Sequence, residues 1–173
     1  MSSDNLTIRR ADSCDAEDIA AISAKCFDEA WTADGLRKDI GNDKVSFYLA
    51  AEHAGSMIGY MGSWMILEEA HVITVGVDPE FRNRKVASTM MLCFFREAVR
   101  RGVHWSTLEV DEDNLSAIRL YEKFGYKTVS VRKNYYGEGR DGLLMWLGGM
   151  HNASFSERLD EIEKDISPEG WDK

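Results

Sequence analysis

The chain has 173 residues, of which 44% are hydrophobic and 29% charged, and its formal net charge is -9. That length fits one domain with a real core, and no apolar run approaches the roughly 18 to 20 residues that cross a bilayer. The excess of acids argues against direct nucleic-acid binding, which needs a basic face. Such an acidic surface either serves solubility or attracts basic peptides and amines.

The composition also bears on export and metal binding. The N-terminal stretch MSSDNLTIRR has no apolar signal core, so we expect no export. Three widely spaced cysteines, Cys14, Cys26 and Cys93, argue against a disulfide framework and a zinc site, and they favour a reducing cytoplasm. The four histidines show no metal-ligand spacing, so we expect no metal.

Hydrophobic periodicity and turn residues divide the first half of the chain into six elements. Asp12 or Ser13 can cap the first helix. The tripeptide HAG offers a tight turn between two strands, and Asp78-Pro79 stops the last strand. The predicted elements are a strand at 6–11, helices at 15–27 and from 32 or 33 to 40, and strands at 45–52, 56–66 and 70–77.

The second half alternates helices and strands before it ends in a hairpin. Gly102 and Gly125 are natural helix stops, because glycine adopts the left-handed conformation that often follows a helix. The predicted elements are a helix at 86–101, a strand at 106–110, a helix at 114–124, and strands at 126–136 and 142–147.

This order of elements predicts an α/β (α+β) fold, a mixed sheet of seven strands with helices on both faces. The unit from residue 70 to residue 110 should be a right-handed parallel crossover. We expect one domain over residues 1–150 and an acidic extension over 151–173. Apolar residues at helical spacing in the extension indicate a short amphipathic helix that docks on the domain. They are Phe155, Leu159, Ile162 and Ile166.

The segment FRNRKVAS, residues 81–88, places three cations between a predicted strand and a predicted helix. A helix N-terminus carries partial positive charge and unpaired N–H groups, so it binds anions such as phosphate. Cations at that end oppose the helix dipole unless an anion is present. Arg82, Arg84 and Lys85 therefore indicate a bound anion or, equally, a solvated basic turn.

Two longer stretches resemble the GNAT acetyltransferase superfamily. The segment EAHVITVGVDPEFRNRKVASTMM is similar to its acetyl-CoA motif, a strand followed by Arg/Gln-x-x-Gly-x-Gly/Ala and a helix. The order LEV, N-x-x-A-x-x-LYEKFGY and RKNYY resembles the ribosomal-protein-alanine N-acetyltransferases, which acetylate the α-amino group of a small-subunit ribosomal protein. The resemblance covers residues 6 to 147 and implies the GNAT fold.

The loop departs from the family pattern at one position. Lys85 stands where the family has its first loop glycine, whereas Ala87 stands at the second glycine position, where the family allows alanine. Glycine serves close backbone approach or left-handed dihedral angles. If Lys85 has a positive φ, its backbone is strained, and if the loop is already helical there, its ammonium group can reach a phosphate.

The resemblance implies acetyl-CoA as cosubstrate. The strand backbone would hold the acetyl and pantetheine groups, and the loop would hold the pyrophosphate. Asn114 would contact the cofactor, cap the following helix, or do both. The implied cofactor residues are Val75, Gly76, Val77, Asn83, Arg84, Lys85, Val86, Ala87, Ser88 and Asn114.

Two residues match the family's catalytic pair. Glu109 matches the general base that removes the amine proton, directly or through a water, although an outward-facing strand acid would look the same. Tyr121 matches the general acid that protonates the departing thiolate. Leu120 and Phe124 are expected to face the core, and Tyr121, about 100° round the helix, would then point to the site. The alternative is a packed tyrosine.

Trp31, and Tyr135 or Tyr136, match the family's peptide groove, although aromatic residues are also common in cores. The resemblance implies acetylation of a protein N-terminus, here expected to be the N-terminal alanine of a ribosomal protein. We expect a monomer. The alternatives are a broader protein Nα-, lysine or small-amine acetyltransferase, and a catalytically decayed binding protein that kept the fold. A further idea is that the acidic extension binds a basic partner.

Overall fold

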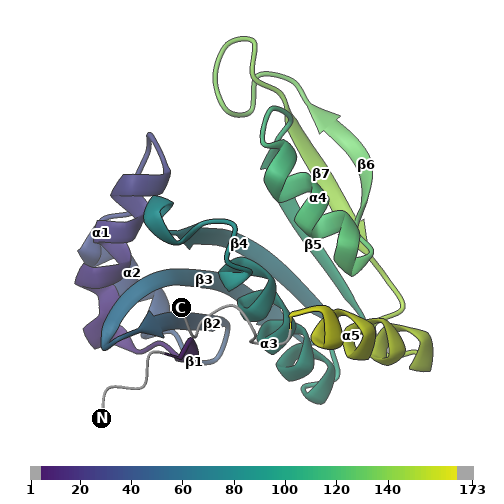
Figure 1. Cartoon of the computed structure of the whole chain (residues 1–173). Coiled ribbons are helices and arrows are strands. Elements are labelled where there is room, and N and C mark those ends of the chain that lie inside the picture. The colour runs from purple at the N-terminus through teal and green to yellow at the C-terminus, as the bar shows by residue number, and fades with distance from the viewer. Residues whose placement is uncertain (1–4, 167–173) are drawn as a thin grey trace.

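The computed structural model describes residues 5–166 and contains one mixed sheet of seven strands (Figure 1). The strand order is β1-β2-β3-β4-β5-β7-β6, and only β4 and β5 are parallel neighbours. The predicted seven-stranded, mostly antiparallel sheet is confirmed. The strands are β1 (Thr7–Arg10), β2 (Ser46–His53), β3 (Ser56–Ile66), β4 (Glu69–Val77), β5 (Trp105–Asp111), β6 (Lys127–Arg132) and β7 (Gly142–Leu147).

Helices cover both faces of the sheet, because the strand side chains alternate between two apolar clusters. Tyr48 and Tyr60 lie in the smaller cluster, together with residues of α1 and α2. Phe47 and Met61 point to the larger cluster, which contains α3 (Figure 1). The helices are α1 (Ala16–Cys26), α2 (Ala33–Ile40), α3 (Val86–Arg100), α4 (Leu115–Phe124) and α5 (Ala153–Ile166).

Short polar side chains cap the N-termini of two helices, and glycines follow the C-termini of two helices, at the positions that the sequence predicts. The Asn114 carboxamide accepts a hydrogen bond from the Ala117 amide at 3.1 Å and so caps α4. Thr32 caps α2 in the same manner. Gly102 and Gly125, which follow α3 and α4, have φ angles of 82° and 105°, values that favour glycine.

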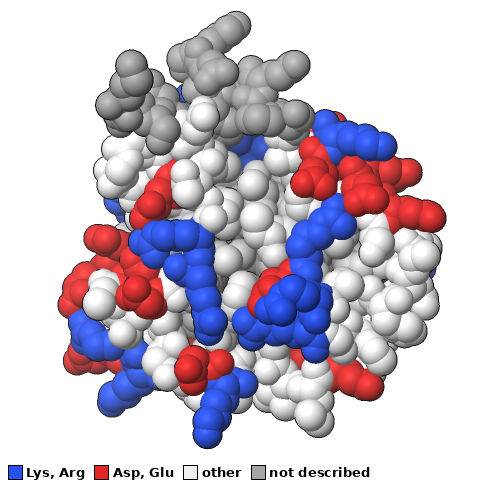
Figure 2. Space-filling view, turned by 90° about the horizontal axis from the view of Figure 1, so that it is seen from below, with Lys and Arg blue, Asp and Glu red and all other residues white. Residues whose placement is uncertain are grey.

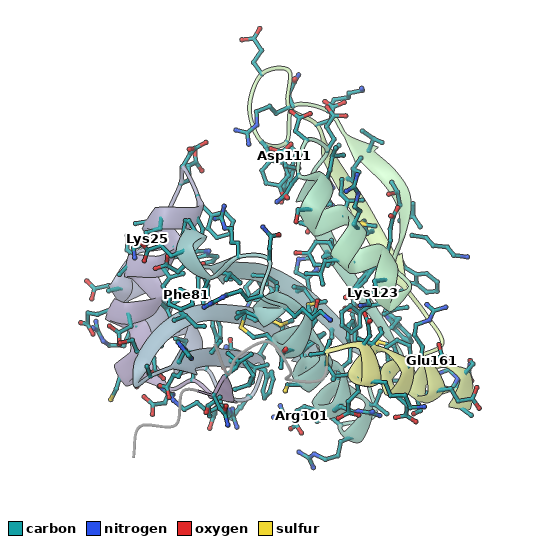
Figure 3. The ribbon with its side chains drawn as sticks, viewed as in Figure 1. Lys25, Phe81, Arg101, Asp111, Lys123 and Glu161 are labelled. Atoms are coloured by element: carbon teal, nitrogen blue, oxygen red, sulfur yellow. The ribbon has the colours of Figure 1, made fainter. Side chains whose placement is uncertain are left out.

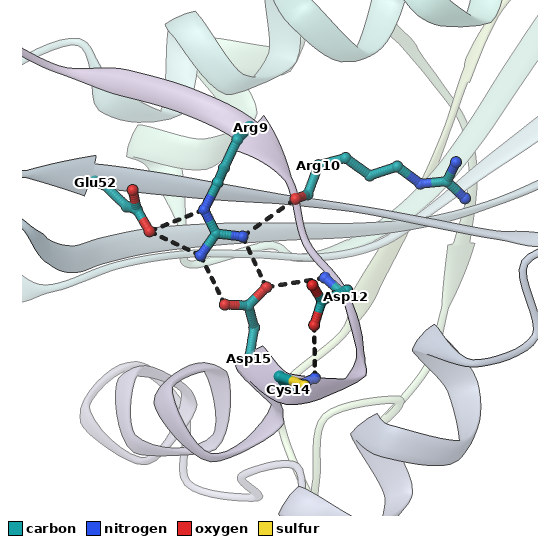
Figure 4. A network of polar contacts seen from close by, with 6 residues as sticks. All are labelled: Arg9, Arg10, Asp12, Cys14, Asp15 and Glu52. Carbon is teal, nitrogen blue, oxygen red and sulfur yellow. Dashed lines mark hydrogen bonds and ion pairs between the residues drawn. The ribbon is translucent and has the colours of Figure 1, made fainter.

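A network around Arg9 fixes the corner between β1 and α1 (Figure 4). The Arg9 guanidinium donates to both oxygens of Asp15, at 2.7 and 2.8 Å, and to Glu52 at 2.9 Å. Asp15 also accepts from the Asp12 amide at 2.9 Å, which closes a capping box ahead of α1. Arg9 therefore lowers the pKa of the Asp15 carboxyl by hydrogen bonding.

The last hairpin differs from the prediction. The strand predicted at 126–136 ends at Arg132, where its pairing with Gly142 stops. Beyond it, Asn134 has a φ angle of 55°, and its amide donates to Asp141 at 3.0 Å. A side-chain contact thus turns the chain before the aromatic pair Tyr135–Tyr136, and these residues belong to the connection between β6 and β7.

The helix α5 lies against α3. Its Phe155, Leu159 and Ile162 side chains are buried in the larger cluster, and the Phe155 ring packs edge-on against Phe95 with ring centroids 5.3 Å apart. Arg96 of α3 contacts two acids on the outer side of α5. The acidic extension predicted from the sequence also includes residues 167–173, which lie outside the described residues.

Figure 2 shows the face of the molecule that lies at the bottom of Figure 1, and charged side chains of both signs occur on it. Lys and Arg stand across the middle of this view, with acidic groups mostly toward its flanks. Among residues 5–166, no helix has both the length and the apolar character needed to span a membrane.

Candidate active site

The two parallel strands, β4 and β5, pair over part of their length and then separate. Their register covers four residue pairs and ends at Val72 opposite Leu108. At that point β4 contains a bulge. The consecutive residues Gly62 and Ser63 of β3 pair with Thr74 and Val72, so Ile73 is an extra residue on β4. A bulge of this kind bends a strand. It turns the rest of β4 away from β5, and we call the resulting opening the fork.

Within residues 5–166, each arm of the fork keeps one strand edge without a strand partner. Residues 74–77 of β4 pair with β3, and residues 109–111 of β5 pair with β7. The edges that face each other therefore carry backbone N–H and C=O groups available to a ligand. Phe81, just past the end of β4, and Asp111, at the end of β5, lie apart on the two arms (Figure 3).

Gly76 on the β4 arm has a packing role. A Cβ atom at this position would lie 2.5 Å from Cε1 of Tyr60, which is fully buried. The carbonyl of the next residue, Val77, accepts hydrogen bonds from Arg82 Nε at 3.2 Å and Cys26 Sγ at 3.3 Å. The end of this arm is thus held rigidly by neighbouring elements.

The loop from β4 to α3 presents an uncapped helix start. Lys85 occupies the N-cap position, without a side-chain cap hydrogen bond, and the first turn of α3 contains no acid. The backbone amides of residues 86–88 therefore face outward with the positive end of the helix dipole. Asn83 and Lys85 have φ angles of 61° and 62°, so the loop winds tightly in front of the helix. This geometry suits a phosphate group.

Lys85 adopts the left-handed conformation, the strained alternative of the two that the sequence left open. Its ammonium group donates to the backbone carbonyl of Asp165, near the C-terminal end of α5. The Asp165 carboxylate also pairs with Lys123 of α4 at 2.5 Å. Helix α5 therefore ends beside the loop that starts α3.

Glu109 projects from the β5 arm and is mostly shielded from solvent, with a side-chain exposure of 14%. One carboxylate oxygen lies 3.1 Å from Nε2 of His71 on β4, and the other lies 3.2 Å from Nη1 of Arg132 on β6. A carboxylate that has a partner at each of its two oxygens is held in one orientation. Glu109 is thus fixed at the base of the fork.

Tyr121 is more buried than expected. It is 8% exposed and lies in the larger core cluster, with its ring edge-on to Tyr126 at 5.9 Å, while Leu120 is only partly buried. The predicted contrast between an inward Leu120 and an outward Tyr121 is wrong, because the α4 face toward the sheet includes both. Burial, with a smaller contribution from Tyr136, raises the pKa of Tyr121 well above its usual value. The phenol keeps its proton at neutral pH.

The connection between β6 and β7 brings aromatic rings toward the same region. Burial, followed by Tyr135, Glu109 and Asp111, raises the pKa of Tyr136 to about 12. Tyr136 therefore lies near both Glu109 and Tyr121. Tyr135 is 47% exposed and packs edge-on against Tyr136, with ring centroids 5.0 Å apart. Tyr135 in turn lies under the guanidinium of Arg132, 5.4 Å from its ring centroid, so both tyrosines belong to the surroundings of Glu109.

Trp31 lies in the connection between α1 and α2, partly buried against the smaller cluster. Its backbone amide donates to Ser23 Oγ at 3.1 Å. The same connection contains Asp28, whose carboxylate lies 3.6 Å from Arg140 of the last hairpin. The two connections that carry the predicted peptide-binding aromatics therefore approach each other.

Sequence reasoning missed His71 and Arg132, the two partners of Glu109. His71 was considered only as a metal ligand, and within residues 5–166 no three His, Cys, Asp or Glu side chains gather into a possible metal site. A parallel alignment of AHVI with STLE, which the predicted crossover allows, would have placed His71 beside Thr107. Arg132 required the register of the last hairpin.

Comparisons with known proteins agree with this fold. Residues 16–126 match the family model described as the acetyltransferase (GNAT) family. A candidate ribosomal protein bS18-alanine N-acetyltransferase from Bacillus subtilis (strain 168) is 32% identical over 138 residues, 77% of this chain and 89% of that protein. The ribosomal protein bS18-alanine N-acetyltransferase of Escherichia coli (strain K12) is 27% identical over 144 residues, 82% of this chain and 96% of that protein.

Solved structures show the same architecture. The crystal structure of the Escherichia coli ribosomal-protein-S18-alanine N-acetyltransferase superposes with a TM-score of 0.77 at 23% identity, over 84% of this chain and 94% of that one. The PaiA N-acetyltransferase of Thermoplasma acidophilum, solved in complex with coenzyme A, gives a TM-score of 0.72 at 18% identity, over 83% of this chain and 98% of that one.

Proposed function

The chain belongs to the GNAT acetyltransferase family, and on that premise we propose that it transfers the acetyl group of acetyl-CoA to the N-terminal α-amine of a protein. The acceptor proposed is the N-terminal alanine of a ribosomal protein, as the names of its relatives indicate for those proteins. The observation that carries the proposal is the fork, with an uncapped helix start suited to an anion on one arm and a half-buried carboxylate on the other. A ribosomal acceptor implies action in the cytoplasm.

The residues present fit acetyl-CoA. The free edge of β4, including Val75, Gly76 and Val77, would pair with the amide-rich pantetheine arm as it would with a peptide strand. The loop and first turn from Asn83 to Ser88 would hold the pyrophosphate. Asn114 keeps its amide NH₂ available for the cofactor, because its oxygen serves as the cap of α4.

The chemistry follows from the groups around the fork. Acetyl-CoA supplies the acetyl thioester. Glu109 takes a proton from the ammonium group of the acceptor, so that the neutral amine can attack the thioester carbon directly. Backbone N–H groups on the free edge of β4 stabilise the oxyanion. Tyr121 then donates its proton to the departing thiolate, as its protonated state at neutral pH allows. The nitrogen loses its second proton as the amide forms, and this proton restores the phenol of Tyr121.

The peptide groove is proposed between the two approaching connections. Trp31 lies on one and Tyr135 on the other, with the ion pair of Asp28 and Arg140 between them. An acidic protein would attract the positively charged N-terminus of a basic ribosomal protein. We propose that a monomer carries out the reaction, since each of these residues comes from one chain.

An acceptor panel tests the proposal. The enzyme is given acetyl-CoA and equal concentrations of three amines: a peptide with a free N-terminal alanine, the same peptide with a blocked N-terminus and one lysine, and spermidine. We expect the free-alanine peptide to show the highest kcat/KM, and initial rates to give the intersecting lines of a ternary-complex mechanism. A higher kcat/KM for the lysine peptide or for spermidine would show that the acceptor is a different class of amine. The absence of acetyl transfer to any of the three amines would contradict the proposed acetyltransferase activity.

A further inference from the structure

One side-chain cluster beside the proposed base has no part in the reaction as described. His71 lies on β4 next to the point where β4 leaves β5, with Thr107 and Glu109 on the same face of β5. The imidazole contacts both neighbours: Nδ1 lies 2.8 Å from Thr107 Oγ1, and Nε2 lies 3.1 Å from Glu109 Oε2. These are hydrogen-bond distances at both ring nitrogens.

We propose that His71 receives, through Glu109, the proton that leaves the acceptor amine and passes it to solvent. This inference rests on the proposed function, in which Glu109 is the base. His71 contacts the carboxylate rather than the amine, so it is a positioning and relay residue. Thr107 completes the arrangement by fixing the orientation of the ring.

The proton balance is simple. The amine proton moves from nitrogen to the Glu109 carboxylate and then along the 3.1 Å contact to Nε2, leaving a carboxylate beside an imidazolium. For this transfer Nδ1 must already carry hydrogen, and the Thr107 hydroxyl can accept it because a hydroxyl accepts as well as donates. With hydrogen on Nδ1, the Nε2 lone pair faces Glu109 and can accept the proton.

The surroundings explain why a carboxylate alone would be a poor final acceptor. Arg132 lies 3.2 Å from the other Glu109 oxygen, and a proton that stayed on Glu109 would remove this ion pair. The adjacent imidazole offers the proton a second location without removing that ion pair. After the transfer, the imidazolium of His71 and the guanidinium of Arg132 both contact the carboxylate of Glu109. The three groups then form a charge-assisted network.

The exit to solvent also favours the ring. The His71 side chain is 28% exposed, twice the 14% of Glu109. Trp64 of β3 stacks on the imidazole with ring centroids 6.1 Å apart, and its indole N–H donates to Asp39 of α2 at 3.1 Å. This stack holds the plane of the ring while one edge stays open.

Other charged groups near the cluster are already engaged. Tyr136 faces Glu109, but with its pKa raised to about 12 it stays neutral at working pH. Asp111, at the end of β5, pairs with Arg140, and Asp39 pairs with Trp64 and Tyr48. The charged groups that act on His71 are therefore Glu109, which contacts it, and Arg132, which contacts Glu109.

The first experiment compares pH profiles of kcat for the wild type, His71→Gln and His104→Gln. The third variant is a matched control, because His104 also faces a glutamate, Glu68 at 3.6 Å, away from the fork. We expect His71→Gln to lower kcat about 10- to 100-fold and to move the acidic limb to lower pH, because glutamine cannot take up the proton that the relay passes on. The control should keep the wild-type profile and rate.

Two variants of Thr107 separate the relay from packing. Thr107→Ser keeps the hydroxyl and loses a methyl group, whereas Thr107→Val keeps the shape and loses the hydroxyl. The relay predicts that the serine variant stays near wild-type kcat while the valine variant falls at least about fivefold, with KM for the acceptor little changed in both. The reverse order would mean that this position matters for packing only and would overturn the proposal.

The outcomes distinguish this inference from the proposed function. All profiles are measured with whichever amine of the panel reacts fastest, so a different acceptor class leaves this test valid. An active wild type whose His71→Gln variant keeps either its kcat or its acidic limb overturns the relay and leaves the function intact. A wild type that acetylates no amine overturns both. Retained acetyl-CoA affinity of each variant, measured by calorimetry, shows that the fork is folded.

Discussion

Lys85 has an unusual backbone conformation at the start of the helix that would bind the cofactor. Its backbone is left-handed at φ 62°, its side chain reaches Asp165, and it precedes the uncapped amides of α3. A non-glycine residue in this conformation costs about 1 kcal/mol relative to glycine. The chain therefore accepts backbone strain where the family motif has glycine and gains a cation beside the anion site.

This strain can be measured with two variants that both remove the ammonium group. Lys85→Ala keeps the Cβ atom and Lys85→Gly removes it, so the glycine variant should be more stable by about 1 kcal/mol in urea unfolding. Calorimetry should give the two variants similar affinities for acetyl-CoA, both weaker than wild type if the ammonium contacts phosphate. Equal stabilities would show that residue 85 is not left-handed in solution.

Asp15 predicts a pH dependence of stability. Arg9 and the capping box lower the pKa of Asp15 in the folded protein below that of an ordinary aspartate. Its stabilisation is therefore present above about pH 4 and is lost as pH falls through the lowered pKa. Asp15→Asn should cost about 1–2 kcal/mol at pH 7 and flatten the acid side of the curve. Urea midpoints from pH 2.5 to 7 test this. The exposed Asp43→Asn serves as control and should match the wild type throughout.

Residue-level prediction from the sequence succeeded where a local rule applied. Asn114 follows a polar turn and precedes an apolar periodic stretch, so its role as helix cap could be predicted. His71 could not be assigned in this way, because its contacts come from the register between two strands separated by a whole helix. Tyr121 was misjudged because helical spacing gives the angle between side chains, and the position of the sheet decides which angle is buried.

At the scale of the elements, α5 joins the core of the domain. Phe155 is 5% exposed, and its ring meets Phe95 of α3, so the helix completes the cover of the larger cluster. Phe155→Ala should therefore destabilise the protein by about 3–5 kcal/mol. Urea unfolding measures this loss, with Glu161→Ala on the exposed face of the same helix as control. A loss below 1 kcal/mol would mean that α5 is dispensable for the core.

Element boundaries were predictable where apolar periodicity coincided with a turn residue. The strand at 56–66 has the same limits in the structure, since the turn at Ala54–Gly55 precedes it and the chain turns again after Ile66. The strand before the last connection was predicted to end four residues too late, because a run such as RKNYY has the composition of a strand. Its true end depends on Asp141, which lies further along the chain and captures the Asn134 amide.

At the scale of the whole molecule, the fork makes stability depend on acetyl-CoA. A ligand that contacts both arms binds the folded state alone and stabilises it by mass action, by about 2.7 kcal/mol at a concentration 100 times its Kd. Thermal unfolding with increasing acetyl-CoA should show a continuous rise in Tm. Adenosine 3′,5′-bisphosphate, which lacks the pantetheine arm, should raise Tm less at equal concentration. No rise at millimolar acetyl-CoA would contradict a cofactor site in the fork.

The fork itself could not be predicted from the sequence. Both β4 and β5 read as continuous strands, and nothing in AHVITVGV marks Ile73 as the residue at which pairing ends. The bulge depends on how β3 aligns with β4, which is a property of the assembled sheet. A family resemblance could imply the opening, whereas periodicity alone would have predicted an uninterrupted sheet.

The short seam between β4 and β5 also divides the molecule for protein engineering. Four residue pairs join a unit that ends with α3 to a unit that begins with β5, and the exposed turn at Gly102 connects them. A chain cut at this turn would give two fragments that meet along the seam and along the α3–α5 contact. Such fragments, each fused to one of two interacting proteins, would form a split reporter whose signal is acetyl transfer.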